Sequence, residues 1–171
     1  MITVALSSSI GATRDRVWRA LTALEERPVW DDRVIGRVTL EPAGLESRRN
    51  RSSPISPPAR AAAPGESRRS VRWRYRLSGI PLVMHEDLLR VCVGERIESR
   101  ISIGSLRLEQ VFTLHAEEDP EAPRIRLGMK VISGNSIAVM GDVVPRLDVQ
   151  KLMIELVDTT LRQIRRHCEI R

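Results

Sequence analysis

The sequence has few cysteines, few aromatic residues and no long uncharged segment. Its two cysteines, Cys92 and Cys168, lie far apart and form no C-x-x-C pair, which argues against a disulfide scaffold and a structural zinc site. The uncharged run at residues 131–141 falls far short of the roughly 20 residues that cross a bilayer. Residues 1–14 lack a basic region followed by an apolar run, so no secretory signal is visible and we expect a cytoplasmic location.

Common catalytic motifs are also missing. No G-x-S-x-G nucleophile elbow, P-loop or G-x-G-x-x-G run is present, which removes the common hydrolase, nucleotide-binding and dinucleotide-binding interpretations. The triplet at residues 85–87 does not begin a zinc-protease motif, because Leu89 stands where the second histidine is needed. We therefore expect no metal and no cofactor.

The chain has the size and composition of one globular domain, with 171 residues, of which 42% are hydrophobic and 29% charged. Its net charge of +6 is concentrated in residues 42–70, where six arginines stand against two glutamates. That segment also holds five prolines, six serines and five alanines without apolar periodicity. This composition predicts a mobile insertion within a single domain of residues 1–171, with at most one short strand near residues 45–51.

Alternating apolar and polar residues predict a series of strands. Residues 2–6 and 34–40 form the first two, and the clearest alternation follows at residues 71–78. Further strands are expected between residues 82 and 131, separated by short turns that contain glycine. Strands joined by such short turns are typical of an antiparallel meander.

Two regions have helical periodicity. Thr13 stands at the N-cap position of a first helix, whose apolar residues recur at spacings of three and four from Val17 to Leu24. From residue 141 onward the period is again helical, and one apolar set recurs every seven residues: Leu147, Ile154, Leu161 and Cys168. This second pattern predicts a long amphipathic C-terminal helix.

The order of these elements and several short patterns resemble a known fold. The patterns are the opening Ser8-Ser9-Ile10-Gly11-Ala12, the following Val17-Trp18-Arg19-Ala20-Leu21, Trp30 in a second short helix, and residues 156–161 in the terminal helix. They resemble the START-like superfamily, also called SRPBCC, which includes birch-pollen-allergen-like proteins, polyketide cyclases and aromatases, and lipid carriers. The resemblance implies an α+β helix-grip fold, in which a curved antiparallel sheet of about six or seven strands wraps around the long helix behind two short N-terminal helices. Because these are patterns of fold, they imply no particular activity.

The resemblance also implies a cavity for an apolar ligand between the sheet and the C-terminal helix. An apolar pocket with a few polar groups is the usual form of a ligand site, although the same side chains could equally fill a core. Gln110 lies on an apolar strand face and should be hydrogen-bonded to a neighbour or to a ligand. The residues expected to line the cavity are Trp73, Tyr75, His85, Gln110, Phe112, Met129, Ile154 and Leu161.

His85 and Asp87 are weak candidates for catalysis. They belong to the more apolar face of the strand at residues 82–93, and if that face points inward, His85 could act as a base oriented by Asp87. The opposite parity would bring in Met84, Glu86 and Leu88.

Three functions remain open. The first, which we favour, is a carrier or sequestering protein for a small hydrophobic molecule such as a lipid, polyketide or isoprenoid. The second is a polyketide cyclase- or aromatase-type enzyme with His85 as its base. The third is an interaction module whose arginines at residues 48–76 meet RNA or an anionic membrane surface. Trp73 and Tyr75 face away from the neighbouring arginines, so we expect no nucleic-acid partner, whereas transient membrane contact stays open.

Overall fold

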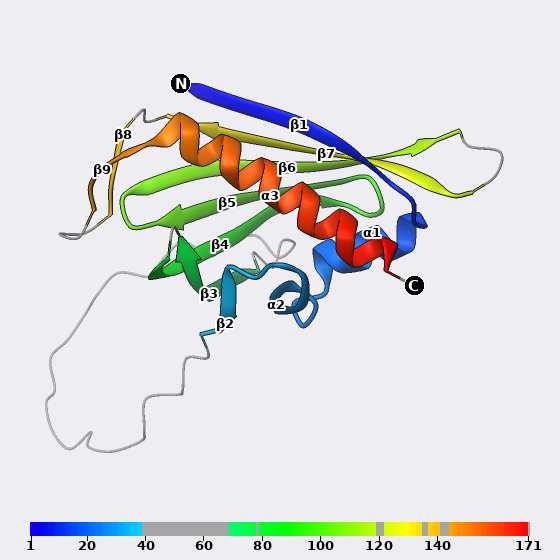
Figure 1. The fold of residues 1–171 in the computed structure, drawn as a ribbon, viewed down its shortest axis with the longest axis horizontal. Coiled ribbons are helices and arrows are strands. Elements are labelled where there is room, and N and C mark those ends of the chain that lie inside the picture. Colours follow the sequence, from blue (N-terminus) through cyan, green and yellow to red (C-terminus); the bar gives the residue numbers. More distant parts are fainter. Residues whose placement is uncertain (39–68, 78, 119–121, 135–136, 141–143, 171) are drawn as a thin grey trace, which may run out of the picture.

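The computed structural model describes residues 1–38, 69–77, 79–118, 122–134, 137–140 and 144–170 (Figure 1). The expected insertion at residues 42–70, with its short strand near 45–51, lies outside the described residues except for its last two positions. The elements, in chain order, are β1 (Ile2–Ile10), α1 (Arg14–Thr22), α2 (Arg27–Trp30), β2 (Val34–Arg37), β3 (Ser70–Leu77), β4 (Ile80–Cys92), β5 (Arg96–Ile103), β6 (Leu106–Glu117), β7 (Arg124–Ser133), β8 (Ile137–Met140), β9 (Val144–Asp148) and α3 (Val149–Glu169).

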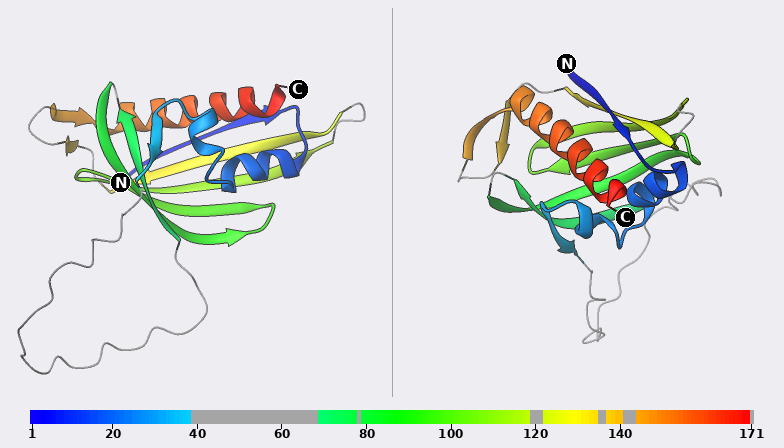
Figure 2. Two further views of the ribbon diagram at one scale, coloured as in Figure 1. Left: turned by 90° about the horizontal axis from the view of Figure 1, so that it is seen from below. Right: turned by 45° about the vertical axis from the view of Figure 1, so that its right-hand side comes forward.

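Seven of the strands form one antiparallel sheet in the order β1-β7-β6-β5-β4-β3-β2. The long helix α3 lies across the concave face of this sheet, and α1 and α2 pack beside it (Figures 1 and 2). The strands β8 and β9 pair separately from the large sheet. This is the helix-grip architecture, so the fold class predicted from the sequence is confirmed.

Period-two patterning decides which side chains of the sheet meet α3. In β3, Val71, Trp73, Tyr75 and Leu77 are buried, while the arginines between them are exposed. Burying one large apolar side chain stabilises the fold by about 1.5–3 kcal/mol, which holds this face against the helix. The largest fully buried side chains of the molecule are Trp73, Tyr75, Ile10, Met84, Ile101, Leu106, Leu108, Leu127, Met129, Met153, Ile164 and Val17.

The helix α3 begins later than the periodicity predicts. Asp148 caps it, because its side chain accepts a hydrogen bond from the Lys151 backbone N–H at 3.2 Å, so Leu147 belongs to β9. The buried face of α3 is centred on Met153 and Ile164, both 0% exposed.

The prediction that Ile154 lines a cavity is wrong, since its side chain is 46% exposed. The seven-residue set follows the edge of the buried face rather than its centre. A seven-residue repeat drifts by about 20° per heptad on a straight helix. From Leu161, which is still buried, that drift moves Ile154 further from the face centred on Met153.

The first half of β4 has the opposite parity from the one that would bring His85 inward. Met84 stands opposite Trp73 and is 1% exposed, so these two side chains share the concave face. His85 stands opposite the exposed Arg72, and Asp87 lies two residues further along the same convex face. The expectation that His85 and Asp87 enter a cavity is therefore wrong.

A β-bulge explains why the apolar pattern of β4 pointed to the wrong face. The register with β5 shifts between Leu88 and Arg90, so one extra residue is inserted there. Beyond the shift Val91 stands opposite the buried Ile97 and joins the concave side. An uninterrupted count of every second residue thus combines the convex face of one half with the concave face of the other.

Candidate functional site

A pocket of about 290 Å³ opens between α1, the connection from α1 to α2, and the concave face of β3 to β6. Its walls are mostly aliphatic and aromatic. Val93, 82% exposed, marks the mouth, whereas Trp73 and Phe112 are almost fully buried. The lining residues are Trp18, Leu21, Thr22, Ala23, Leu24, Arg27, Arg69, Val71, Trp73, Glu86, Leu88, Val91, Val93, Ile97 and Phe112.

The helix that walls this pocket is α1 rather than α3, in contrast to the cavity implied by the resemblance. Of the residues expected to line the cavity, Trp73 and Phe112 do line the pocket. Others are buried in the core outside the pocket lining: Tyr75, Gln110, Met129 and Leu161. Gln110 donates a hydrogen bond from Nε2 to Ser99 Oγ at 3.3 Å, so its partner is a neighbouring strand.

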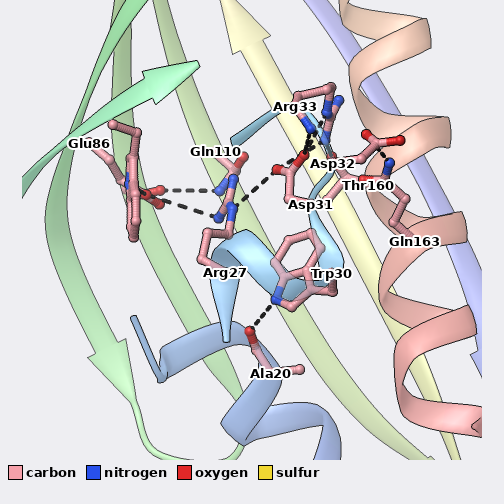
Figure 3. Close-up of polar contacts among 12 residues, drawn as sticks. Ala20, Arg27, Trp30, Asp31, Asp32, Arg33, Glu86, Gln110, Thr160 and Gln163 are labelled. Atoms are coloured by element: carbon pink, nitrogen blue, oxygen red, sulfur yellow. Dashed lines mark hydrogen bonds and ion pairs between the residues drawn. The ribbon is translucent and has the colours of Figure 1, made fainter. Parts of the chain in front are cut away.

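Local sequence explains how α1 and α2 come to close the pocket. The Thr13 hydroxyl accepts a hydrogen bond from the Arg16 backbone N–H at 3.3 Å, which confirms the predicted N-cap of α1. Trp30, near the end of α2, donates from Nε1 to the Ala20 carbonyl at 2.7 Å. This bond links the two short helices and thereby fixes the position of Arg27, one turn before Trp30 (Figure 3).

The polar part of the pocket is made by Arg27 and Glu86, which approach each other from α2 and β4 (Figure 3). The distance from Arg27 Nη1 to Glu86 Oε2 is 4.0 Å, longer than a hydrogen bond. Glu86 Oε2 also accepts a hydrogen bond from Trp73 Nε1 at 3.1 Å. The Arg27 guanidinium lies 4.7 Å from the centroid of the Trp30 ring, a cation–π distance.

Asp31 supports this arrangement from behind. Its carboxylate is fully buried and accepts hydrogen bonds from Arg27 Nε at 3.2 Å and from Arg33 Nε at 2.8 Å. Arg33 in turn donates to the Thr160 hydroxyl on α3 at 2.7 Å. Burial acts to raise the pKa of Asp31, but the charges of Arg27 and Arg33 and the hydrogen bonds from Arg33 outweigh it and hold that pKa below its ordinary value.

The same cluster keeps Arg27 charged. Burial acts to lower the pKa of Arg27, but the carboxylates of Glu86 and Asp31 outweigh it, so that pKa lies above its ordinary value. Tyr75 lies beside the cluster with its ring centroid 5.5 Å from the Arg33 guanidinium, and burial raises the pKa of its phenol. The pocket therefore combines apolar walls with one buried cation and one carboxylate.

Sequence reasoning missed the residues that give the pocket its polar character. Arg27 precedes a proline in a four-residue helix, where no periodic pattern singles it out. Glu86 appeared only as part of the opposite parity of β4. One signal was present: two charged residues, Arg27 and Asp31, flank Trp30 at a spacing of four, which allows an ion pair on one helical turn.

The fold was compared with known proteins. A START superfamily protein from Mycobacterium smegmatis superposes with a TM-score of 0.61 at 15% identity, covering 98% of this chain and 97% of that one. A protein from Thermus thermophilus gives 0.61 at 20% identity, with coverage of 98% and 97%. The Zhui aromatase/cyclase from Streptomyces sp. R1128 gives 0.60 at 15% identity, with coverage of 98% and 93%. The chain therefore has the START-like fold that its sequence resembles.

At the level of sequence, the comparisons found nothing. No protein-family model matches the chain, and no curated protein matches it either. Across the ranges that the structure describes, no helix is long and apolar enough to cross a membrane.

Proposed function

We propose that this protein binds a small hydrophobic molecule, of the lipid, polyketide or isoprenoid kind, in the pocket between α1 and β3 to β6, as a carrier or sequestering protein. The observation that carries the proposal is the pocket itself: a hollow with largely apolar walls in which Trp73 and Phe112 lie deep and Val93 lies at the mouth. Hydrophobic transfer supplies about 25 cal/mol per Å² of apolar surface, so a ligand that buries roughly 250 Å² gains about 6 kcal/mol before the costs of association.

A polyketide cyclase-type activity receives less support from the described residues. It would need a base inside the pocket, and the candidates His85 and Asp87 lie on the convex face. The likeness to an aromatase/cyclase at 15% identity concerns the fold. The third alternative, the basic segment, falls mostly in residues 39–68, outside the described residues.

Native mass spectrometry of the purified protein tests the proposal, first as isolated and then after equilibration with the neutral probe N-phenyl-1-naphthylamine. We expect one apolar molecule per chain in at least one of the two spectra, and organic extraction of the isolated protein would identify a resident ligand. An unliganded mass in both spectra, together with no change in the fluorescence of the probe, would contradict the proposal.

A further inference from the structure

Arg27 is a buried cation whose hydrogen-bonding capacity is only partly used. Its side chain is 10% exposed, and its Nε donates to Asp31 at 3.2 Å. Within the described part of the chain, neither Nη nitrogen makes a hydrogen bond, and the nearest carboxylate oxygen lies 4.0 Å away on Glu86. Because a guanidinium carries donors on both Nη nitrogens, this group is able to receive an acceptor from a molecule in the pocket.

The charges around this position already balance. Arg27 and Arg33 are the two cations of the cluster, and Asp31 and Glu86 are the two carboxylates. A ligand carboxylate bound to Arg27 would lie beside Glu86 and add an unbalanced negative charge in a largely buried site. A ligand ammonium bound to Glu86 would lie beside Arg27 and carry the opposite penalty. Burying an uncompensated charge costs several kcal/mol, so both ionic groups are disfavoured.

From these contacts we propose that the ligand carries a neutral hydroxyl group, held between Arg27 and Glu86 while its apolar body fills the rest of the pocket. The inference rests on the proposed function and specifies its ligand class. A hydroxyl both accepts and donates, so one oxygen can accept from Arg27 Nη1 and donate to Glu86 Oε2. With the two protein atoms 4.0 Å apart, an oxygen about 2.9 Å from each completes both hydrogen bonds without moving either side chain.

Trp73 restricts the direction of the second hydrogen bond. Its indole N–H donates to Glu86 Oε2 at 3.1 Å, which holds that oxygen toward the pocket as an acceptor. A group that accepts but cannot donate, such as a methyl ether, therefore satisfies Arg27 and leaves Glu86 without its partner. The site should thus separate a hydroxyl from an ether of nearly the same shape.

Four ligands that share one bicyclic body test this inference: naphthalene, 2-naphthol, 2-methoxynaphthalene and 2-naphthoate. Each competes at pH 7 with N-phenyl-1-naphthylamine bound to the full chain, and the displacement curve gives its affinity. Since hydrogen bonds to charged groups contribute about 1.5–3 kcal/mol, we expect 2-naphthol to bind at least about tenfold more tightly than naphthalene. We expect the ether to bind within about threefold of naphthalene, because a single hydrogen bond only offsets the desolvation of its oxygen. We expect 2-naphthoate to bind most weakly.

The substitution Glu86→Gln provides a second measurement on the same series. It removes the negative charge and leaves Arg27 in place, so we expect the affinity for 2-naphthoate to rise and the affinity for 2-naphthol to fall, each by about tenfold, with naphthalene unchanged. Glu109→Gln, the same change on an exposed residue of β6, is the matched control and should change none of the affinities.

The possible failures are distinguishable. If naphthalene and the probe both fail to bind, the proposed function itself is wrong. If naphthalene binds but 2-naphthol binds no more tightly, or 2-naphthoate binds most tightly to the unsubstituted protein, the pocket is retained and the hydroxyl inference is overturned. The series on the unsubstituted chain decides this even where Glu86→Gln fails to fold.

Discussion

Asp31 neutralises two guanidinium groups at once in the interior of the protein. It is 0% exposed, and both Arg27 and Arg33 donate to its carboxylate. Through Arg33 it is also linked to Thr160 on α3. Removing one member of a buried ionic cluster is costly chiefly because it leaves the opposite charges uncompensated. The position of Arg27 in the pocket therefore depends on Asp31.

We predict that Asp31→Asn lowers the free energy of unfolding by about 3–5 kcal/mol, because two buried cations lose their shared anion. Urea denaturation followed by circular dichroism measures this loss. Asp158→Asn is the matched control: its ion pair with Arg162 joins side chains that are 59% and 70% exposed, and we expect a change of at most about 1 kcal/mol. Equal losses in the two variants would refute the role given to Asp31.

The same pair of proteins gives a pH dependence of known sign. The pKa of Asp31 is lower in the folded chain than its ordinary value of 3.8, so its stabilising effect is fully present above that value and is lost as the pH falls toward the folded pKa. The difference in unfolding free energy between the natural chain and Asp31→Asn should therefore shrink between pH 5 and pH 2. A constant difference over that range would contradict the lowered pKa.

At the scale of single elements, α3 shows how neighbouring apolar residues differ in importance. Met153 is 0% exposed and Ile154 is 46% exposed, although periodicity alone selected Ile154. We predict that Met153→Ala costs about 2–5 kcal/mol by leaving a cavity in the core, and that Ile154→Ala costs less than about 1 kcal/mol. Chemical denaturation of both variants measures this contrast. Similar costs would mean that α3 packs with a different face against the sheet.

The sequence predicted elements well where one period runs without interruption. In β3 four buried residues alternate with three exposed arginines, and the structure follows this pattern. It failed at irregularities that a period cannot express. The bulge between Leu88 and Arg90 changes the parity of β4, and the Asp148 cap ends the helical pattern before Leu147. Both features depend on pairing with other parts of the chain, so a one-dimensional pattern carries little information about them.

At the scale of the whole molecule, the order of elements was sufficient to predict the helix-grip fold but not the position of its pocket. Trp73 and Phe112 were expected at a ligand site and do line the pocket. The opposing wall is α1 with Leu21 and Leu24, because α3 packs closely against Met129 and its neighbours. Which helix fills the concave face and which leaves a hollow depends on side-chain volumes across several elements, and periodicity does not measure these.

The central claim is that an apolar molecule binds in the pocket beside α1, and filling the pocket tests it most directly. Leu21→Trp places an indole in the pocket, whereas Val83→Trp adds the same group to the exposed convex face of β4, where Val83 is 45% exposed. Titration of both variants with N-phenyl-1-naphthylamine should show affinity at least about tenfold weaker for Leu21→Trp and unchanged for Val83→Trp. Equal affinity in the two variants would contradict the claim.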